Sequence, residues 1–277
     1  MTDPLAALRP GLLSGHTVFI TGGASGINLG VGLAFARLGA SVGLCGRDAE
    51  RLARARGELE AAGAAAVSAT VADVRDAAAV EAAMQVARDA FGPMHTLVCG
   101  AAGNFPAAAE SLSPNGFRAV VEIDLNGTFH ACRAAFEQLR ETRGSIVMIS
   151  APQATAPYAG QAHVGAAKAG VDQLMRTLAL EWGRFGIRAN GVVPGPVEDT
   201  EGVRRLLPGT AAERAARIVP LGRLGRAEDI GAAVVFLASP MAAYVSGALL
   251  AVDGGGGLAG SGHWNALFAG TEGDDPR

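Results

Sequence analysis

Lysine is almost absent from this sequence: the 23 lysine and arginine residues include a single lysine, Lys168. Cysteine is also scarce, and Cys45, Cys99 and Cys132 lack the spacing of metal ligands, which indicates reduced thiols rather than a metal site. The net charge of −3 offers no basic field to nucleic acid. No run of about 18 apolar residues predicts a membrane span, and no charged-then-apolar leader is present, so we expect a cytoplasmic protein.

What is present is a regular alternation of β-rich and helical segments in a chain that is 49% hydrophobic. Strand-like segments are 16–20, 41–45, 65–71, 96–99, 145–149, 188–193 and 249–252. Segments with helical spacing are 27–38, 49–62, 77–91, 115–121 running into a longer helix that ends near 140, 163–185, a weaker stretch at 203–207, and 227–238. Apolar strands that alternate with helices predict a doubly wound parallel sheet of about seven strands, an α/β Rossmann fold. We expect a single domain over 1–277, with a core at 12–257 and a tail at 258–277.

A glycine-rich turn joins the first predicted strand to the first predicted helix. Gly22 and Gly26 bring backbone N–H groups close to a pyrophosphate at the helix N-terminus, and this position at the start of a βα series indicates a dinucleotide site. Asn28 replaces the usual third glycine, and we expect the turn to survive because asparagine tolerates left-handed backbone. The alternative is a turn with a purely structural role.

The end of the second strand predicts the cofactor. An NAD site usually has an acid there, whereas a 2′-phosphate favours arginine. This strand ends in Arg47 with no acid before it, which predicts NADPH through a charge-assisted bond to the phosphate. The alternative is that Arg47 lies in a solvated loop.

Lys168 lies on the apolar stripe of a predicted helix, three residues before Val171. A lysine in that position is partly buried and needs a partner. The alternative is a chance survivor in an arginine-biased composition. The same helix carries a stripe of Leu174, Leu178 and Trp182.

Motifs spread over residues 12–257 resemble the short-chain dehydrogenase/reductase family. They are TGGASGI at 21–27, Asp73-Val74, Ala101-Ala102-Gly103, Lys168, Ile187-Arg188-Ala189-Asn190, Pro194-Gly195-Pro196-Val197 and Asp253-Gly254-Gly255. The resemblance implies cofactor contacts from Thr21, Gly22, Ser25, Gly26, Ile27, Arg47, Asp73, Val74, Ala101, Ala102, Gly103, Lys168, Pro194, Gly195, Val197 and Thr200. It also implies a homotetramer, and the stripe that includes Leu174 is a candidate for pairing between subunits.

The chain departs from the family at three of its four catalytic positions. In the family a tyrosine four residues before the lysine protonates a carbonyl oxygen, and a serine and an asparagine complete the set. Here those positions hold Val164, Ala151 and Asp124, so that only Lys168 remains. The structural alternative for Asp124 is a helix N-cap or first-turn acid.

One branch of the family, the peroxisomal-type 2,4-dienoyl-CoA reductases, resembles this pattern because it uses an aspartate and a lysine. The resemblance implies Asp124 and Lys168 as catalytic residues, NADPH as cofactor and conversion of a 2,4-dienoyl-CoA to a 3-enoyl-CoA. The C-terminus lacks a peroxisomal address such as SKL, which favours a cytosolic relative.

An acyl-CoA substrate implies further contacts, which are less specific. Candidates are Asn104, Phe105, Arg118, Arg204 and Arg205, together with a substrate lid at 198–219. Solvated arginines and a core phenylalanine are the alternatives, and His163 is interpreted as a structural polar group.

Two other functions also fit this sequence. The first is a carbonyl or 3-oxoacyl reductase that uses Tyr158, Ser150 or a water as proton donor. The second is a catalytically silent NADP(H)-binding sensor or scaffold, although such a protein has no reason to retain both Lys168 and Asp124.

Overall fold

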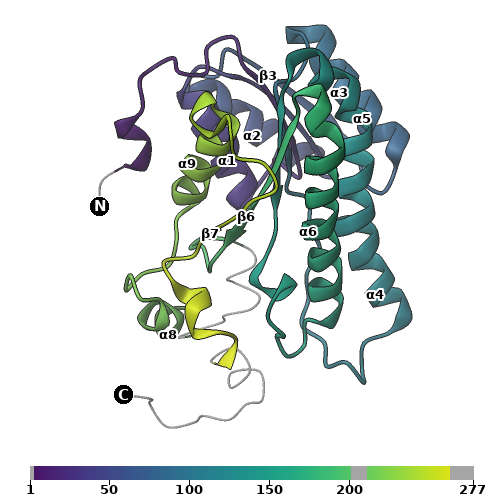
Figure 1. Cartoon of the computed structure of the whole chain (residues 1–277), viewed down its shortest axis with the longest axis vertical. Coiled ribbons are helices and arrows are strands. Elements are labelled where there is room, and N and C mark those ends of the chain that lie inside the picture. Colours follow the sequence, from purple (N-terminus) through teal and green to yellow (C-terminus); the bar gives the residue numbers. More distant parts are fainter. Residues whose placement is uncertain (1–2, 201–210, 263–277) are drawn as a thin grey trace.

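The computed structural model describes residues 3–200 and 211–262. Its centre is a sheet of seven parallel strands in the order β3-β2-β1-β4-β5-β6-β7 (Figure 1). The strands are β1 Thr17–Thr21, β2 Ser41–Gly46, β3 Ala66–Val71, β4 Thr96–Cys99, β5 Ser145–Ile149, β6 Arg188–Pro194 and β7 Leu249–Val252. The strand order changes direction between β1 and β4, which is where ligands bind in open α/β sheets. The predicted fold class is confirmed.

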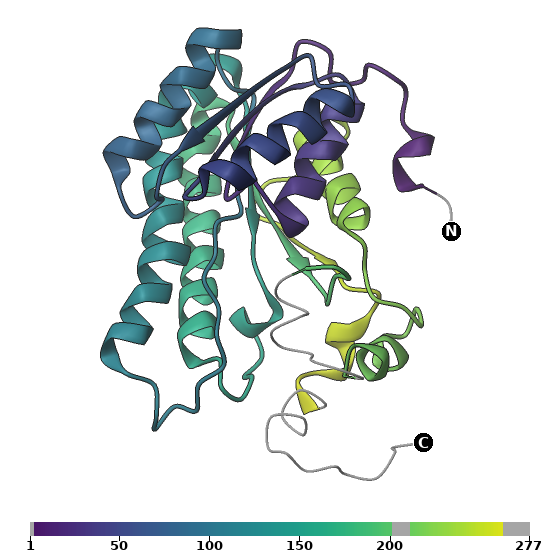
Figure 2. The same cartoon turned by 180° about the vertical axis from the view of Figure 1, so that it is seen from behind.

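Helices cover both faces of this sheet (Figures 1 and 2). The helices are α1 Gly26–Arg37, α2 Ala49–Ala61, α3 Ala77–Phe91, α4 Pro114–Val121, α5 Gly127–Thr142, α6 Ala162–Trp182, α8 Ala211–Ile218 and α9 Ala227–Ala238. One apolar core lies under α1, α2 and α9, and a second lies under α3, α5 and α6. No helix within the described ranges is long and apolar enough to cross a membrane.

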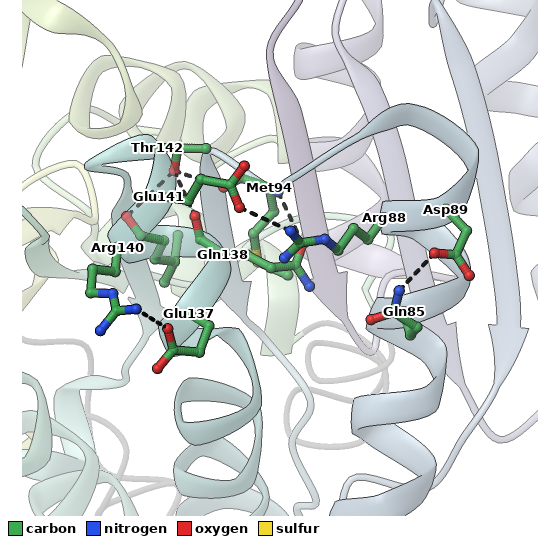
Figure 3. A network of polar contacts seen from close by, with 10 residues as sticks. Gln85, Arg88, Asp89, Met94, Glu137, Gln138, Arg140, Glu141 and Thr142 are labelled. Carbon is green, nitrogen blue, oxygen red and sulfur yellow. Dashed lines mark hydrogen bonds and ion pairs between the residues drawn. The ribbon is translucent and has the colours of Figure 1, made fainter.

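Polar contacts link α3 and the loop that follows it to α5, beside the second core (Figure 3). Arg88 on α3 forms an ion pair of 2.9 Å with Glu141 on α5. Gln138 accepts a hydrogen bond of 3.1 Å from the Met94 backbone N–H, and Thr142 donates one of 2.9 Å to the Met94 carbonyl. These bonds satisfy buried backbone groups where the chain leaves α3 for β4, at the edge of the sheet opposite the carboxyl ends of the strands.

The structure differs from the predicted elements in two places. The segment expected to be irregular contains α8, whose alanine-rich sequence favours a helix. The weaker helical stretch at 203–207 lies outside the described residues. In addition, the helices predicted on either side of residue 122 form one continuous path through a π-helical turn, Glu122–Asn126.

The π-helical turn determines how Asp124 is presented. The N–H of Gly127 bonds the carbonyl of Glu122, five residues earlier, where an α-helix would bond four residues earlier. Gly127 at the end of the turn packs against Val74, so that a Cβ there would lie 2.6 Å from Val74 Cγ2. The wider turn alters the rotation of the helix, and Asp124 lies buried facing α6.

Candidate active site

The glycine-rich turn lies at the carboxyl end of β1 and fits a dinucleotide. Gly22 has φ +66°, and a Cβ on it would lie 2.9 Å from Ala101 Cα, so both backbone conformation and space require glycine. Gly26, with φ +55°, opens the N-terminus of α1, and the nearest atom to a Cβ there is Thr200 Cγ2 at 3.8 Å. The turn therefore exposes helix N–H groups to an anionic pyrophosphate.

Asn28 supports this turn for a reason that differs from the predicted one. It lies inside α1, and among the described residues only Arg143 and Asp199 combine a side chain with positive φ. The turn survives the replacement of glycine by Asn28, as expected, but tolerance of left-handed backbone is not the reason because Asn28 is helical. Its Nδ2 donates to the Gly100 carbonyl at 2.8 Å and to the Gly22 carbonyl at 3.2 Å. Asn28 thus ties the turn to the end of β4.

The remaining predicted cofactor residues line or support the same edge of the sheet. Thr21 is buried, and its hydroxyl accepts hydrogen bonds from the N–H groups of Gly100 at 3.1 Å and Ala101 at 3.3 Å. Ser25 precedes α1 without a capping hydrogen bond from its side chain. Ile27, Val74, Ala101, Ala102, Pro194, Gly195 and Val197 follow the strands or begin the helices around the turn.

Arg47 follows β2 as an exposed side chain. Near it, Asp73 forms an ion pair with Arg75, with Nη2 to Oδ2 at 2.6 Å and Nε to Oδ1 at 3.0 Å. These hydrogen bonds hold the pKa of Asp73 below its usual value, and the charge of Arg47 adds to the effect. Because Arg75 already neutralises Asp73, the positive charge of Arg47 is available to an anionic ligand.

Asp124 and Lys168 form a buried ion pair. Lys168 Nζ lies 3.6 Å from Asp124 Oδ2, and the two side chains are 7% and 1% exposed. Asp124 Oδ1 accepts a hydrogen bond of 2.7 Å from the Gly103 N–H, and Lys168 Nζ donates one of 2.8 Å to the Ile149 carbonyl. Asp124 Oδ2 makes no hydrogen bond within the described residues. Asp124 is therefore in a helix interior facing a cation, and it does not cap a helix.

Burial dominates the electrostatics of this pair. It raises the pKa of Asp124 above its usual value, while Lys168 and the Gly103 N–H act in the opposite direction. A second buried acid lies one turn after Lys168: Asp172 accepts a hydrogen bond of 2.5 Å from the Ser150 hydroxyl. Burial also raises the pKa of Asp172. An acid four residues after a buried lysine was the sequence signal for Asp172, and sequence reasoning missed it.

The family's tyrosine position is apolar. Val164 is 3% exposed and packs with Val120 and Ala167 where α4 meets α6. Tyr158 precedes α6, and burial together with the charge of Asp253 raises its pKa. Ser150 is the alternative proton donor next to Ala151, the family's serine position, but its hydroxyl donates a hydrogen bond to Asp172. These contacts provide no tyrosine at the family's position beside Lys168.

Two of the candidate substrate residues, Asn104 and Phe105, directly follow Gly103, whose N–H donates to Asp124. Phe105 packs its ring against His163 on α6, with ring centroids 4.5 Å apart. Asn104 is half-buried beside it, and Arg118 lies exposed on α4. Arg204 and Arg205 lie outside the described residues, as does the middle of the predicted lid.

Metal chemistry has no candidate site in residues 3–200 and 211–262, where no group of three or more His, Cys, Asp or Glu side chains is arranged to hold an ion. The site consists instead of a nucleotide-binding turn at the β1/β4 switch point and a buried carboxylate–ammonium pair beyond the ends of β4 and β5. That combination defines a dinucleotide-dependent oxidoreductase of the Rossmann type.

Comparison with known proteins identifies the family. The family model described as Enoyl-(Acyl carrier protein) reductase matches residues 22–256. A short-chain dehydrogenase of Bacillus anthracis has a similar structure, with a TM-score of 0.81, 37% identity, and coverage of 88% of this chain and 97% of that one. The chain therefore belongs to the short-chain dehydrogenase/reductase family, which implies NAD or NADP as cofactor, and the predicted resemblance is confirmed.

The names of two curated relatives state a substrate and a product. The peroxisomal 2,4-dienoyl-CoA reductase of Saccharomyces cerevisiae, named as (3E)-enoyl-CoA-producing, is 41% identical over 253 residues, which are 89% of this chain and 86% of the relative. A probable 2,4-dienoyl-CoA reductase of Bacillus subtilis, named as (2E)-enoyl-CoA-producing, is 42% identical over 242 residues, which are 86% of this chain and 95% of the relative.

Proposed function

We propose that this protein reduces a 2,4-dienoyl-CoA to a 3-enoyl-CoA with NADPH. The observation that supports this proposal is the buried Asp124–Lys168 pair beside an apolar Val164. The curated relatives named as 2,4-dienoyl-CoA reductases support the same substrate class. Because their names carry different product isomers, the 3-enoyl product is the part of the proposal that most needs direct measurement.

The missing tyrosine favours conjugate reduction over ketone reduction. A ketone becomes an alkoxide, which needs a proton donor on oxygen, and a positioned donor contributes about 10²–10⁴-fold in rate. When bound, NADPH supplies a hydride to C5 of the dienoyl group. The electron pairs of the two double bonds then shift toward the thioester, which leaves a dienolate with negative charge on oxygen, and protonation at C2 yields the 3-enoyl product.

Asp124 and Lys168 provide for that protonation. Asp124 Oδ2 has no hydrogen bond within the described residues, while Oδ1 is held by Gly103 and Nζ by Ile149. The pair can hold a water between its free lone pairs and the ammonium protons, and such a water delivers the proton to carbon. Because burial raises the pKa of Asp124, the carboxyl group takes up and returns a proton more readily than an exposed acid at neutral pH.

NADPH is favoured over NADH by the surroundings of Arg47. Its exposed side chain follows β2, where the adenosine ribose lies in this fold. Asp73 is paired with Arg75 and does not draw Arg47 into a hydrogen bond. Arg47 therefore suits a 2′-phosphate, and the other cofactor contacts are those of the turn that contains Gly22 and Gly26.

Asn104, Phe105 and Arg118 are assigned to the acyl-CoA. Phe105 is 36% exposed although its ring packs on α6, which suits an apolar wall of a substrate channel. Arg118 is exposed on α4 and suits a phosphate of coenzyme A. The segment 198–219 remains the predicted lid.

A homotetramer is part of the proposal, but its contacts differ from the predicted stripe. Leu178 is buried, and Leu174 and Trp182 pack into the core beneath α6, so that stripe faces inward. Exposed apolar side chains on these helices include Phe129 on α5, 50% exposed, and Leu180 on α6, 83% exposed. Light scattering of the purified protein tests this assembly, and a monomeric mass contradicts it. A cytoplasmic location remains a prediction.

The decisive experiment compares two substrates. NADPH oxidation is followed with a 2,4-dienoyl-CoA and with a 3-ketoacyl-CoA of the same chain length. We expect faster turnover of the dienoyl substrate, with a 3-enoyl product identified by mass spectrometry and NMR. Faster turnover of the ketone supports a carbonyl reductase instead, and tight NADPH binding without turnover of either thioester supports a silent binding protein.

A further inference from the structure

His163 is buried and its ring makes no hydrogen bond. The side chain is 0% exposed, and neither Nδ1 nor Nε2 has a hydrogen-bond partner within the described residues. The Phe105 backbone lies near the ring but does not meet hydrogen-bond geometry. A buried polar group without a partner costs about 1–3 kcal/mol. Both ring nitrogens of His163 therefore have hydrogen-bonding capacity that the described residues do not use.

The position of His163 relates it to the ion pair. It lies in the first turn of α6, five residues before Lys168, and its ring packs against Phe105. The same short segment contributes Gly103, whose N–H donates to Asp124. One stretch of three residues therefore holds both the aspartate and the histidine, and the negative charge of Asp124 acts on His163.

Two other polar side chains near the ion pair already have hydrogen-bond partners. Lys168 Nζ donates to the Ile149 carbonyl, and the Ser150 hydroxyl donates to Asp172. Val164, in the family's tyrosine position, has no polar atom to offer. A dienolate nevertheless needs a donor aimed at its oxygen, because charge develops there during hydride addition.

We propose that His163 is a substrate-contacting residue whose ring N–H donates a hydrogen bond to the thioester oxygen of the bound acyl-CoA. This inference rests on the proposed reduction of an unsaturated acyl-CoA. No proton is transferred in this contact: His163 stabilises the oxygen, and the proton at C2 comes from the water held by Asp124 and Lys168.

The chemistry of the ring suits this contact. Burial lowers the pKa of His163, against the opposing effects of the Phe105 backbone and the Asp124 charge. The ring is therefore neutral at pH 7 and carries one N–H donor. A neutral imidazole can polarise a carbonyl without losing its proton to the product. The second ring nitrogen is a hydrogen-bond acceptor. The neutral ring can therefore lie near both the positive charge of Lys168 and the negative charge of Asp124 without repulsion.

The test uses two substitutions at His163 with 2,4-hexadienoyl-CoA as the probe. His163→Phe keeps an aromatic ring against Phe105 and removes both nitrogens. We expect kcat to fall about 10²–10³-fold, as for loss of one oxyanion donor, with little change in KM or in the Kd for NADPH. The melting temperature should stay equal or rise, because an unpaired buried polar group has been removed.

His163→Gln provides the matched control because its amide N–H reaches a similar position. We expect it to recover at least about tenfold in kcat over His163→Phe, about one hydrogen bond of 1.4 kcal/mol. A merely structural histidine predicts the opposite pattern, a lower melting temperature with kcat unchanged in both variants, and that result overturns the inference alone. Wild-type protein that does not turn over the probe overturns the proposed function and this inference with it.

Discussion

Replacing Asp124 by asparagine separates the charge of the buried pair from its shape. The amide oxygen of Asp124→Asn can still accept the 2.7 Å hydrogen bond from the Gly103 N–H, so the π-helical turn keeps its contact with that segment. What the variant loses is an ionisable group beside Lys168. We expect kcat for a 2,4-dienoyl-CoA to fall about 10²–10⁴-fold, which corresponds to about 3–5 kcal/mol of activation free energy.

The stability of the variants follows from the direction of the pKa shift. The folded state holds a proton on Asp124 more tightly than the unfolded chain does, because burial raises its pKa. Ionisation of Asp124 therefore lowers the free energy of unfolding once the pH exceeds its unfolded pKa, and this cost disappears as pH falls through the folded pKa. In Asp124→Asn the removal of this cost is opposed by the Lys168 ammonium, which is then buried without a counter-ion, so we expect a net loss on the order of 3 kcal/mol at pH 7. Asp124→Ala removes the same charge and also leaves the Gly103 N–H without an acceptor, so it should lose about 1–3 kcal/mol more than Asp124→Asn.

The assay pairs urea unfolding and NADPH titration with steady-state turnover. Glu122→Gln is the control, since it removes a carboxylate from the same π-helical turn without a contact to Lys168. We expect it to retain wild-type kcat. If Asp124→Asn folds, binds NADPH and turns over within about threefold of the wild type, a difference of only about 0.7 kcal/mol, the carboxylate has no chemical role and the reasoning is refuted.

Three further predictions concern the cofactor site and the opposite end of the sheet. Asn28→Asp should lower the free energy of unfolding by about 2–4 kcal/mol, because a carboxylate would then face the carbonyls of Gly22 and Gly100. Urea titration measures this change, and an unchanged free energy of unfolding contradicts the role of Asn28 in tying the turn to β4. Arg47→Ala should weaken NADPH binding about tenfold with little effect on NADH, measured by fluorescence titration; equal losses for both cofactors contradict a 2′-phosphate contact. Burial lowers the pKa of His16 to about 4 from 6.5, so the unfolded state binds more protons between those values. Stability should therefore fall by on the order of 3 kcal/mol as pH drops from 6.5 to 4, and His16→Gln should flatten that slope in unfolding curves.

The fold was predictable because its signals are local and repeated. Apolar strands that alternate with helices predict a parallel sheet, and the observed strands lie within a residue or so of the predicted segments. The polar composition of the segment after β6 predicts a loop, although its alanines favour the helix α8 that forms there. The glycine-rich turn is recognisable in the sequence because its geometry requires glycine: Gly22 has positive φ and lies close to Ala101.

The site was predictable only in part, since its geometry depends on contacts between distant segments. The motifs identify Asp124 and Lys168, but a π-helical turn has no sequence signature here, and that turn presents the aspartate to α6. The role of Asn28 depends on carbonyls of Gly22 and Gly100, which the sheet brings together. The isolation of the His163 nitrogens likewise follows from what surrounds them in space.

Two of the three departures from the family pattern, Val164 and Asp124, are physically linked. With Val164 in the tyrosine position, the ammonium of Lys168 has the Ile149 carbonyl as its hydrogen-bond partner and would be buried without a counter-ion; Asp124 supplies that charge. Charge balance alone, however, predicts a direct hydrogen bond, because a buried pair recovers its desolvation cost only at close contact. The observed separation is 3.6 Å, and Asp124 Oδ2 makes no hydrogen bond within the described residues. Asp124 Oδ2 therefore retains the accepting capacity that the proposed mechanism assigns to a water beside the pair.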